Sequence, residues 1–343
     1  MLRGVQCVRG RIGLEEHRAC MLQPDHPCHK TPDMLEAMTN KDPEREGIFY
    51  SPSTLLACQR QSALTKGRDY WVDVDGSGWN QLRGHIAHAY FEDKAPWPGV
   101  LGVVREKRFR TEVETKYGVR VFGGKSDLVV LNSQDADGTL HISVVDYKTK
   151  REIRHECCGS ADSYPVVEAD RDNQMQVNLY GWLVARELPG ILNNLWALPE
   201  RSEEWAKMAE DAHLQLNAGV SLSKVTGIVV DTLEIVYFDM KQSRRFTSAA
   251  ELTAQGKLTK RSYPQEHETL ELSPIFTLKH EYVGRWVRKH VEIAIEAEMA
   301  LPAPLTGNKA AHICGWCPVR DDCIAIGEQE GRSMDEQKSA KVW

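Results

Sequence analysis

The chain has 343 residues, of which 41% are hydrophobic, enough to fill one large core or two modest ones. Its formal net charge of −6 argues against a protein that binds nucleic acid over its whole surface. It contains no apolar run near the roughly eighteen residues of a membrane span, and its first residues lack the apolar segment of a secretory signal. We therefore expect a folded intracellular protein without a membrane partner.

The first part of the chain is predicted to be irregular and then helical. Residues 1–48 are rich in Cys, His, Pro and charge, and we expect an extension that is wrapped on the core or partly disordered. From "SPSTLLACQRQSAL" the pattern turns helical, with Ser53 as the expected N-cap. A second helix is expected over "NQLRGHIAHAYFEDK", where apolar residues recur at helical spacing.

The next three segments change to the period of β-strands. They are "VREKRFRTEV", "YGVRVFGGKSDLVVLN" and "GTLHISVVDYKTK". The last two are joined across "SQDADG", in which Asp137-Gly138 is a good hairpin signal. These segments predict a small antiparallel sheet.

Helices predominate after the sheet. "DRDNQMQVNLYGWLVARELPG" predicts a strong helix that Pro189 and Gly190 close. The other expected elements are helices over 203–217 and 281–300 and one or two strands over 226–240. Because no repeat or low-complexity linker separates these elements, a single α/β domain with a helical cap is favoured over two independent domains.

Acidic residues on the predicted hairpin suggest a metal site. In "VVDYKTK", Asp146 and Lys148 are two apart on a strand, so their side chains share one face. Asp127 on the partnered strand can bring a second carboxylate, and the carbonyl of Tyr147 adds an oxygen ligand suited to Mg²⁺ or Mn²⁺. Asp-x-Lys alone is more often a solvated edge pair, but the buried strand before it and Asp127 favour a site.

Two helices add polar candidates to these acids. Gln176 and Tyr180 are four apart, hence on one helix face, where an amide and a phenol can reach a nucleotide or phosphate. Upstream, His88 follows Gly84 on the second helix and can supply an imidazole ligand, although a lone helical histidine is more often an ordinary polar or core residue.

The cysteines indicate a second metal site. Nine cysteines in a chain without an export signal argue against a disulfide framework. Cys314, Cys317 and Cys323 form a C-x2-C-x5-C array, which has three of the four thiolates that a tetrahedral Zn²⁺ or an iron–sulfur cluster needs.

The order of these motifs resembles that of RecB-like nucleases in the PD-(D/E)XK superfamily, over about residues 50–325. The residues that carry the resemblance are Gly84 and His88, Gly124 and Asp127, Asp146-Tyr147-Lys148, and Gln176 with Tyr180. A single Cys before the first motif and a C-x2-C-x5-C array after the last resemble the iron–sulfur branch, which includes AddB-type helicase-nuclease domains and the CRISPR-associated exonuclease family.

The resemblance implies an α/β fold with a PD-(D/E)XK restriction-endonuclease-like core. This is a central mixed sheet flanked by helices, with a helical iron–sulfur-stapled cap. The expected domains are an N-terminal extension over 1–48, the nuclease domain over 49–326 and a polar C-terminal tail over 327–343. The setting it implies is the cytoplasm of a prokaryote or a phage-infected cell.

The resemblance also implies a role for each matched residue. The metal ligands are His88, Asp127, Asp146 and the Tyr147 carbonyl. Lys148 positions the attacking water or counters phosphate charge, and Gln176 and Tyr180 position the nucleic-acid strand. Glu106 resembles an acidic residue often present between the first two motifs. Cys58 is the fourth ligand of the cysteine array, and a 4Fe–4S cluster is favoured over Zn²⁺.

These roles together predict an iron–sulfur DNA exonuclease that uses Mg²⁺ or Mn²⁺ and acts on single-stranded DNA or DNA ends. A helicase or a recombination or repair protein is an expected partner. One alternative is a nucleic-acid-binding or assembly subunit of a DNA repair or processing complex. Another is a structure-specific endonuclease with a zinc staple, which would be colourless where the cluster protein is brown.

Overall fold

The computed structural model describes the chain over residues 2–7, 10–21, 34, 50–67, 70–73, 82, 84, 86, 98–149, 169–200, 202–238, 243–247, 275–302, 317, 319 and 323–326. The chain divides into two compact units. One comprises Met1–Ile86, Glu114–Arg120 and Arg288–Trp343, and the other comprises Ala87–Val113 and Val121–Val287.

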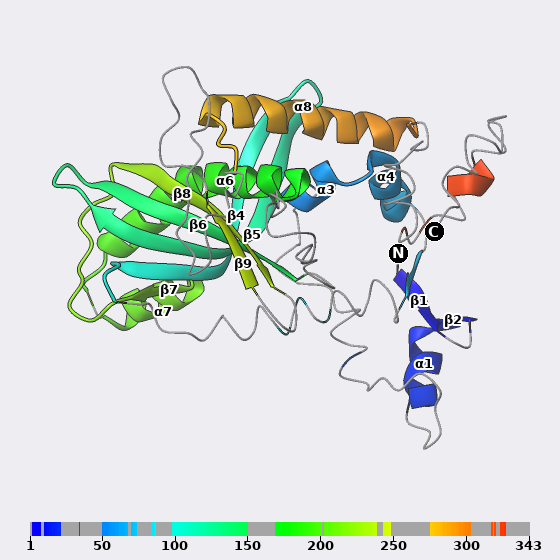
Figure 1. Ribbon diagram of the computed structural model, residues 1–343, viewed down its shortest axis with the longest axis horizontal. Helices are drawn as coiled ribbons and strands as arrows, with labels where there is room; N and C mark the ends of the chain where they lie inside the picture. Colours follow the sequence, from blue (N-terminus) through cyan, green and yellow to red (C-terminus); the bar gives the residue numbers. More distant parts are fainter. Residues whose placement is uncertain are drawn as a thin grey trace, which may run out of the picture. The chain divides into compact units, whose positions relative to one another are not determined.

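A six-stranded mixed sheet forms the centre of the second unit (Figure 1). Its strands, in sheet order, are β7 (Leu214–Leu216), β4 (Gly102–Thr115), β5 (Gly118–Gln134), β6 (Thr139–Thr149), β8 (Gly227–Phe238) and β9 (Ser243–Thr247). β5 and β6 pair antiparallel, whereas β6 and β8 pair parallel. The β5–β6 pair is antiparallel, as the sequence predicts, but it belongs to a larger sheet, and the mixed sheet implied by the resemblance is confirmed.

The β5–β6 hairpin closes as its turn residues predict. Gly138 has a φ of +89°, in the left-handed region that favours glycine. The Thr139 N–H donates to the Asp137 carboxylate at 2.9 Å, which fixes the turn before β6 begins. The turn starts the pairing, and a bulge between Leu131 and Ser133 then shifts the register by one residue, so that Asp127 comes opposite Asp146.

Helix α6 (Arg171–Trp196) lies along one face of the sheet, over β6 and β8 (Figure 1). It begins at Asp170, whose side chain accepts hydrogen bonds from the backbone N–H groups of Asp172 and Asn173. Gly181 allows the close approach to β8, because a Cβ there would lie 2.9 Å from Leu233 Cδ2. The side chains of β8 that lie beside Leu233 on its face therefore point toward α6.

Apolar residues are buried on both faces of the sheet. On β6, Leu140, Ile142 and Val144 are fully buried on the α6 face. Val145 points to the opposite face, where it clusters with Leu128 and other buried side chains. A strand buried on both sides reads as a continuous apolar run, which explains why "HISVV" has no clear alternation.

Helix α6 continues past the predicted stop at Pro189. The prediction that Pro189 and Gly190 close this helix is wrong, because the helix runs to Trp196 with Pro189 inside it. A proline inside a helix costs about 3 kcal/mol. Burial of Leu188 and Leu192 and two hydrogen bonds between Asn193 and the backbone of Val225 offset that cost.

The predicted helix over 203–217 is only partly observed. Helix α7 covers Glu203–Asp211, and the chain then enters β7, which pairs antiparallel with β4. The edge of the sheet offers hydrogen bonds that the helical pattern of this segment does not reveal. The segment predicted as one or two strands over 226–240 forms the single strand β8.

The first unit contains a three-stranded sheet in the order β2-β1-β3. Its strands are β1 (Leu2–Cys7), β2 (Gly10–Gly13) and β3 (Tyr70–Asp73), and helix α1 (Leu14–Met21) follows β2. The expectation of an irregular segment is therefore wrong for these N-terminal residues. β1 completes backbone hydrogen bonding with β3, a partner that lies far away in the sequence.

The helix predicted from "SPSTLLACQRQSAL" is two helices, α3 (Pro52–Leu56) and α4 (Gln59–Gly67). The N-cap of α3 is Ser51, not the predicted Ser53, because Ser51 and Thr54 form a capping box. Cys58 lies between the two helices, and its carbonyl accepts from the Ser62 N–H at 3.0 Å.

Helix α8 (His280–Met299) is observed where the sequence predicts it. In the second unit, the segment before it is held by Asn178 of α6, which donates to the Phe276 carbonyl and accepts from the Leu278 N–H, both at 2.8 Å. Among the described residues, every helix is too short or too polar to cross a lipid bilayer.

Candidate active site

Two aspartates lie where β5 and β6 stop pairing. The paired residues run from Gln134–Leu140 to Leu128–Val145, and Asp127 and Asp146 come one residue later. Residues opposite each other in an antiparallel pair share a face, so both carboxylates lie on the α6 side of the sheet. Asp127 is 7% and Asp146 only 1% exposed, which indicates that other groups compensate their charge.

The Asp127 carboxylate binds the backbone of the neighbouring strand. Its Oδ2 accepts a hydrogen bond from the Tyr147 N–H at 2.7 Å. In a β-strand the N–H and C=O of one residue point to the same side. The carbonyl of Tyr147 is therefore directed toward β5, the side on which Asp127 lies.

Asp146 and Lys148 form a partly buried ion pair on β6, in which the carboxylate is buried and the lysine is half-buried. Lys148 Nζ lies 2.9 Å from Asp146 Oδ1, to which it donates a hydrogen bond, and 2.8 Å from Oδ2. Burial alone would lower the pKa of Lys148, but the charges of Asp146 and Asp127 outweigh burial and raise it. Lys148 is therefore an ammonium group that donates hydrogen bonds and does not act as a base.

Helix α6 adds a phenol and an amide to this group. The Gln176 amide donates to Tyr180 Oη at 3.0 Å. Burial raises the pKa of Tyr180, Asp146 and Asp127 raise it further, and Lys148 opposes them. Because the phenol interacts with all three charges, it lies beside them and keeps its proton.

The structure thus brings together five of the predicted site residues: Asp127, Asp146, Lys148, Gln176 and Tyr180. The backbone of Tyr147 lies among them. His88 lies outside the described residues.

A third buried acid lies close to this group. Glu106 on β4 is 4% exposed and pairs with Lys125 at 2.6 Å. Lys125 is two residues before Asp127 on β5, so both side chains share a face. Glu106 has a φ of +49°, an uncommon value for a residue other than glycine that is often found at functional sites. Its burial and backbone conformation were not predictable from its position in a charged strand.

Tyr237 of β8 is a site residue that sequence reasoning missed. It pairs in register with Lys148. Its Oη accepts hydrogen bonds from the Asp170 N–H at 3.0 Å and from Asn173 Nδ2 at 2.7 Å. Tyr237 thereby ties the beginning of α6 to the sheet beside Lys148. The only sequence signal was its place in an alternating strand.

The donor set fits a hard divalent cation. Carboxylate oxygens and a backbone carbonyl are the ligands that Mg²⁺ and Mn²⁺ prefer. Asp146 Oδ2 is buried and has no hydrogen bond among the described residues, although it faces Lys148. In the part of the chain that the structure describes, no group of three or more His, Cys, Asp or Glu side chains is arranged to hold a metal ion. A complete site would therefore use non-acidic oxygens, water or a ligand outside the described residues.

Arg60 joins two of the cysteine segments in the first unit. This arginine is 1% exposed, and its Nε donates to Cys323 Sγ at 3.1 Å. Its Nη1 donates to the Pro302 carbonyl at 2.6 Å. Arg60 lies two residues after Cys58, so the Cys58 segment lies close to Cys323. Cys317 is half-buried, and Cys314 lies outside the described residues.

Comparisons with known proteins identify the family. No curated protein matches the chain. A solved structure titled "Crystal structure of SSO0001" is 11% identical, with a TM-score of 0.40, and its match covers 84% of this chain and 91% of that one; so weak a likeness carries no argument. The model of the PD-(D/E)XK nuclease superfamily matches residues 80–324, which include the whole candidate site. The chain therefore belongs to the PD-(D/E)XK nuclease superfamily.

Proposed function

We propose that this protein is a metal-dependent DNA exonuclease that acts on single-stranded DNA or DNA ends. The main support for nuclease activity is that Asp127, Asp146 and Lys148 lie together where β5 and β6 stop pairing. All three groups are present, whereas a subunit that only bound DNA would not need to keep two carboxylates and an ammonium group buried together. The preference for ends and single strands rests on the resemblance to RecB-like nucleases.

In this proposal the acids and the backbone hold Mg²⁺ or Mn²⁺. The ligands are Asp127, Asp146 and the Tyr147 carbonyl, with His88 as a fourth. A bound ion would activate water and stabilise the charge that develops on the phosphate. It would also offset the acidic charge that otherwise repels DNA.

The protein's own side chains orient the reacting groups. Lys148 is held as an ammonium group by Asp146, so it can donate to the attacking water or to a phosphate oxygen. Tyr180 accepts from Gln176 and keeps its own proton. That O–H can donate to the DNA backbone and hold the strand against α6.

Digestion of end-labelled DNA tests this function. Wild-type protein with Mg²⁺ or Mn²⁺ should degrade linear single-stranded DNA and leave circular single strands intact. Asp146→Asn should abolish degradation, and Glu281→Gln, which alters an exposed acid on α8, should not. Cutting of circular DNA would indicate the endonuclease alternative. DNA binding without any metal-dependent cutting would indicate the binding-subunit alternative.

We also propose that Cys58, Cys314, Cys317 and Cys323 hold a 4Fe–4S cluster. The contact between Arg60 and Cys323 supports this, because it brings the Cys58 segment to the C-terminal array. An N–H donated to sulfur also stabilises the negative charge of a metal-bound thiolate.

The metal content distinguishes the cluster from zinc. Protein purified without oxygen should be brown and contain iron and acid-labile sulfide, and Cys317→Ser should lose both. Cys157→Ser, outside the proposed ligand set, is the control. A colourless protein that contains zinc would indicate that these cysteines bind zinc instead of an iron–sulfur cluster.

The remaining expectations extend this proposal to the whole chain. The nuclease domain occupies residues 49–326, a range that contains the family match over 80–324. Residues 1–48 form an N-terminal extension and 327–343 a polar tail. The protein works in the cytoplasm of a prokaryote or a phage-infected cell, with a helicase or a recombination or repair protein as its partner.

A further inference from the structure

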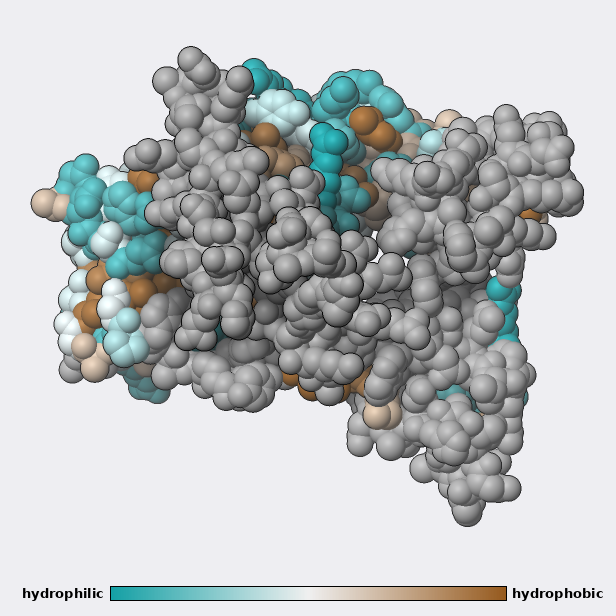
Figure 2. Space-filling model, viewed as in Figure 1, coloured by the Kyte–Doolittle hydropathy of each residue, from teal (hydrophilic) through white to brown (hydrophobic). Residues whose placement is uncertain are grey.

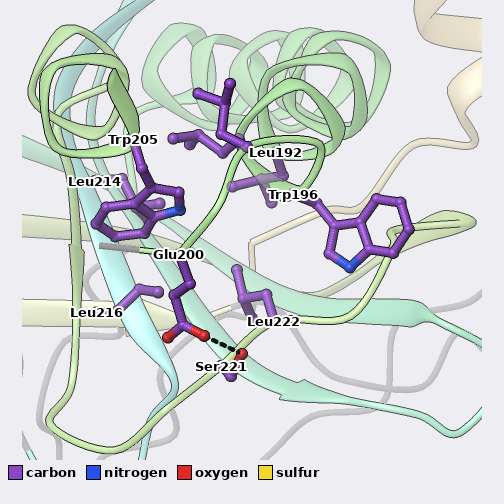
Figure 3. Close-up of a pocket in the computed structure, with 10 residues that line it drawn as sticks. Leu192, Trp196, Glu200, Trp205, Leu214, Leu216, Ser221 and Leu222 are labelled. Carbon is purple, nitrogen blue, oxygen red and sulfur yellow. Dashed lines mark hydrogen bonds between the residues drawn. The ribbon is translucent and has the colours of Figure 1, made fainter. Parts of the chain in front are cut away.

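A small apolar pocket lies at the end of α6, in the second unit. Leucines from α6 and β7 line it, among them Leu192, Leu195 and Leu214. Figure 3 shows the indole rings of Trp196 and Trp205 on opposite sides of it. We name it the Trp196–Trp205 pocket. Its volume of about 150 Å³ is below the roughly 300 Å³ typical of small-molecule sites. The pocket is therefore suited to a single side chain rather than to a cofactor.

The pocket opens to solvent with an aromatic residue at its edge. Trp196 is 53% exposed, an unusual exposure for so large an apolar side chain. Figure 2 shows hydrophobic residues, in brown, interspersed among hydrophilic ones at the left of the view. Tryptophans at an exposed apolar surface are the residues that most often dominate protein–protein binding energy.

The pocket is remote from the catalytic group. Tyr180 and Trp196 are separated by sixteen residues of α6, and at 1.5 Å per residue this is about 24 Å. No residue that lines the pocket belongs to the proposed active site. A phosphate bound at the proposed active site therefore does not reach the Trp196–Trp205 pocket.

Acidic residues predominate in the segment that supplies most of the pocket's lining. Residues 194–222 contain five acids and two bases: Glu200, Glu203, Glu204, Glu210 and Asp211 against Arg201 and Lys207. All five acids are exposed. Glu200 lines the pocket, and its Oε2 accepts a hydrogen bond from Ser221 Oγ at 3.2 Å, the dashed line in Figure 3. This charge repels a nucleic-acid backbone and attracts lysine and arginine side chains.

We propose that the Trp196–Trp205 pocket is a docking site for a basic linear segment of a partner protein. One large apolar side chain of that segment inserts between the two indoles, against the leucines. A neighbouring lysine or arginine pairs with Glu200 at the rim. The surface is small, so the interaction is transient and links the nuclease to a partner without covering its active site.

Peptide selection on the full-length protein tests this inference. Random peptides displayed on phage are selected against wild-type protein without added metal. The expected consensus is Leu, Phe or Trp flanked by Lys or Arg. By fluorescence anisotropy, Trp196→Ala and Glu200→Lys should each weaken binding of a selected peptide by at least about tenfold, as for central interface residues. Tyr282→Ala, which removes an exposed aromatic residue of α8, should bind as wild type does.

Charge exchange keeps the test decisive if Trp196→Ala fails to fold. A peptide with its basic residues changed to glutamate should bind Glu200→Lys better than it binds wild type. An acidic consensus, or enrichment that Trp196→Ala and Glu200→Lys leave unchanged, would overturn the inference. So would self-association, or binding of a DNA oligonucleotide, that depends on Trp196. DNA digestion is scored separately, so failure of this inference and failure of the nuclease proposal are distinguishable.

Discussion

Lys148 and Asp146 form an ion pair at the centre of the proposed site. The carboxylate is 1% exposed, and the ammonium group lies within 2.9 Å of both its oxygens. A buried pair of this kind is a modest source of stability but is costly to break, because the remaining charge is left without compensation. A divalent cation beside Asp146 would provide the same compensation, so the pair and the metal are energetically linked.

Lys148→Gln should therefore lower the free energy of unfolding by about 3 kcal/mol in the absence of metal, because it leaves the Asp146 carboxylate without its ion pair. Mg²⁺ should restore part of this loss and should stabilise the variant more than it stabilises wild type. Urea unfolding with EDTA and with Mg²⁺ measures both effects. Equal stabilisation of the two proteins by Mg²⁺ would contradict a metal site at Asp146.

Tyr180→Phe tests the phenol without changing the shape of the side chain. It removes the acceptor for Gln176, so the free energy of unfolding should fall by about 1 kcal/mol. Digestion of single-stranded DNA should slow, with the larger change in KM if Tyr180 holds the strand. Tyr282→Phe is the control, because Tyr282 is an exposed tyrosine on α8. An unchanged KM would exclude Tyr180 from DNA binding.

At the scale of elements, the two ends of the β5–β6 hairpin serve different purposes. At one end the strands part and leave Asp127 and Asp146 beside α6. At the turn end, His141 is held between carboxylates, with Nδ1 2.8 Å from Asp231 and Nε2 3.1 Å from Asp135. The turn end therefore contributes to stability, and the other end holds the proposed active site.

His141 should make stability depend on pH. Hydrogen bonds to Asp231 and then to Asp135 raise its pKa above the ordinary 6.5. The stabilisation is thus fully present below the unfolded pKa and is lost as pH rises through the raised folded pKa. The difference in unfolding free energy between wild type and His141→Gln should be largest at acidic pH and shrink above about pH 6.5. A difference that stays constant from pH 5.5 to 8.5 in urea titrations would refute this.

Asn193 anchors the part of α6 that continues beyond Pro189. Its amide donates to the Val225 carbonyl at 2.9 Å and accepts from the Val225 N–H at 2.8 Å. Asn193→Ala should lower the free energy of unfolding by about 2 kcal/mol, since both backbone groups of the buried Val225 lose these partners. DNA digestion should be unaffected under conditions where the protein is folded. Asn194→Ala, an exposed neighbour, should leave stability unchanged.

At the scale of the whole molecule, the proposed active site and the proposed cysteine staple belong to different units. Asp127, Asp146 and Tyr180 lie in the second unit, whereas Cys58, Cys317 and Cys323 lie in the first. Substitutions can be made in the proposed active site and in the cysteine staple separately, so loss of activity and loss of stability can be distinguished by experiment.

Cys58→Ser should lower the midpoint of thermal unfolding and release iron from anaerobically purified protein, because a four-thiolate cluster would lose one ligand. Asp146→Asn should release none. Circular dichroism during heating, together with iron analysis, measures the two effects. Full retention of iron in Cys58→Ser would remove Cys58 from the ligand set.

The positions of the site residues were predictable because each depends on local pattern. Asp146 and Lys148 share a face in any strand, and Gln176 and Tyr180 share a face in any helix. The Asp137-Gly138 turn predicted the hairpin, but the bulge between Leu131 and Ser133 that places Asp127 opposite Asp146 was seen only in the structure. Local propensity did not reveal that α6 passes through Pro189 or that Leu214–Leu216 forms an edge strand, since both depend on packing against distant residues.

The sequence by itself determined most of the strands and helices of the second unit and the candidate site residues, because hydrophobic period and turn residues act over short distances. Only the tertiary structure decided that β6 and β8 pair in parallel and that α6 lies over them, bringing Tyr180 to the two aspartates and Lys148. It also decided the burial of Glu106 and the role of Tyr237. These contacts join residues far apart in the chain, and their free energy comes from burying both faces of the sheet, which no local pattern specifies.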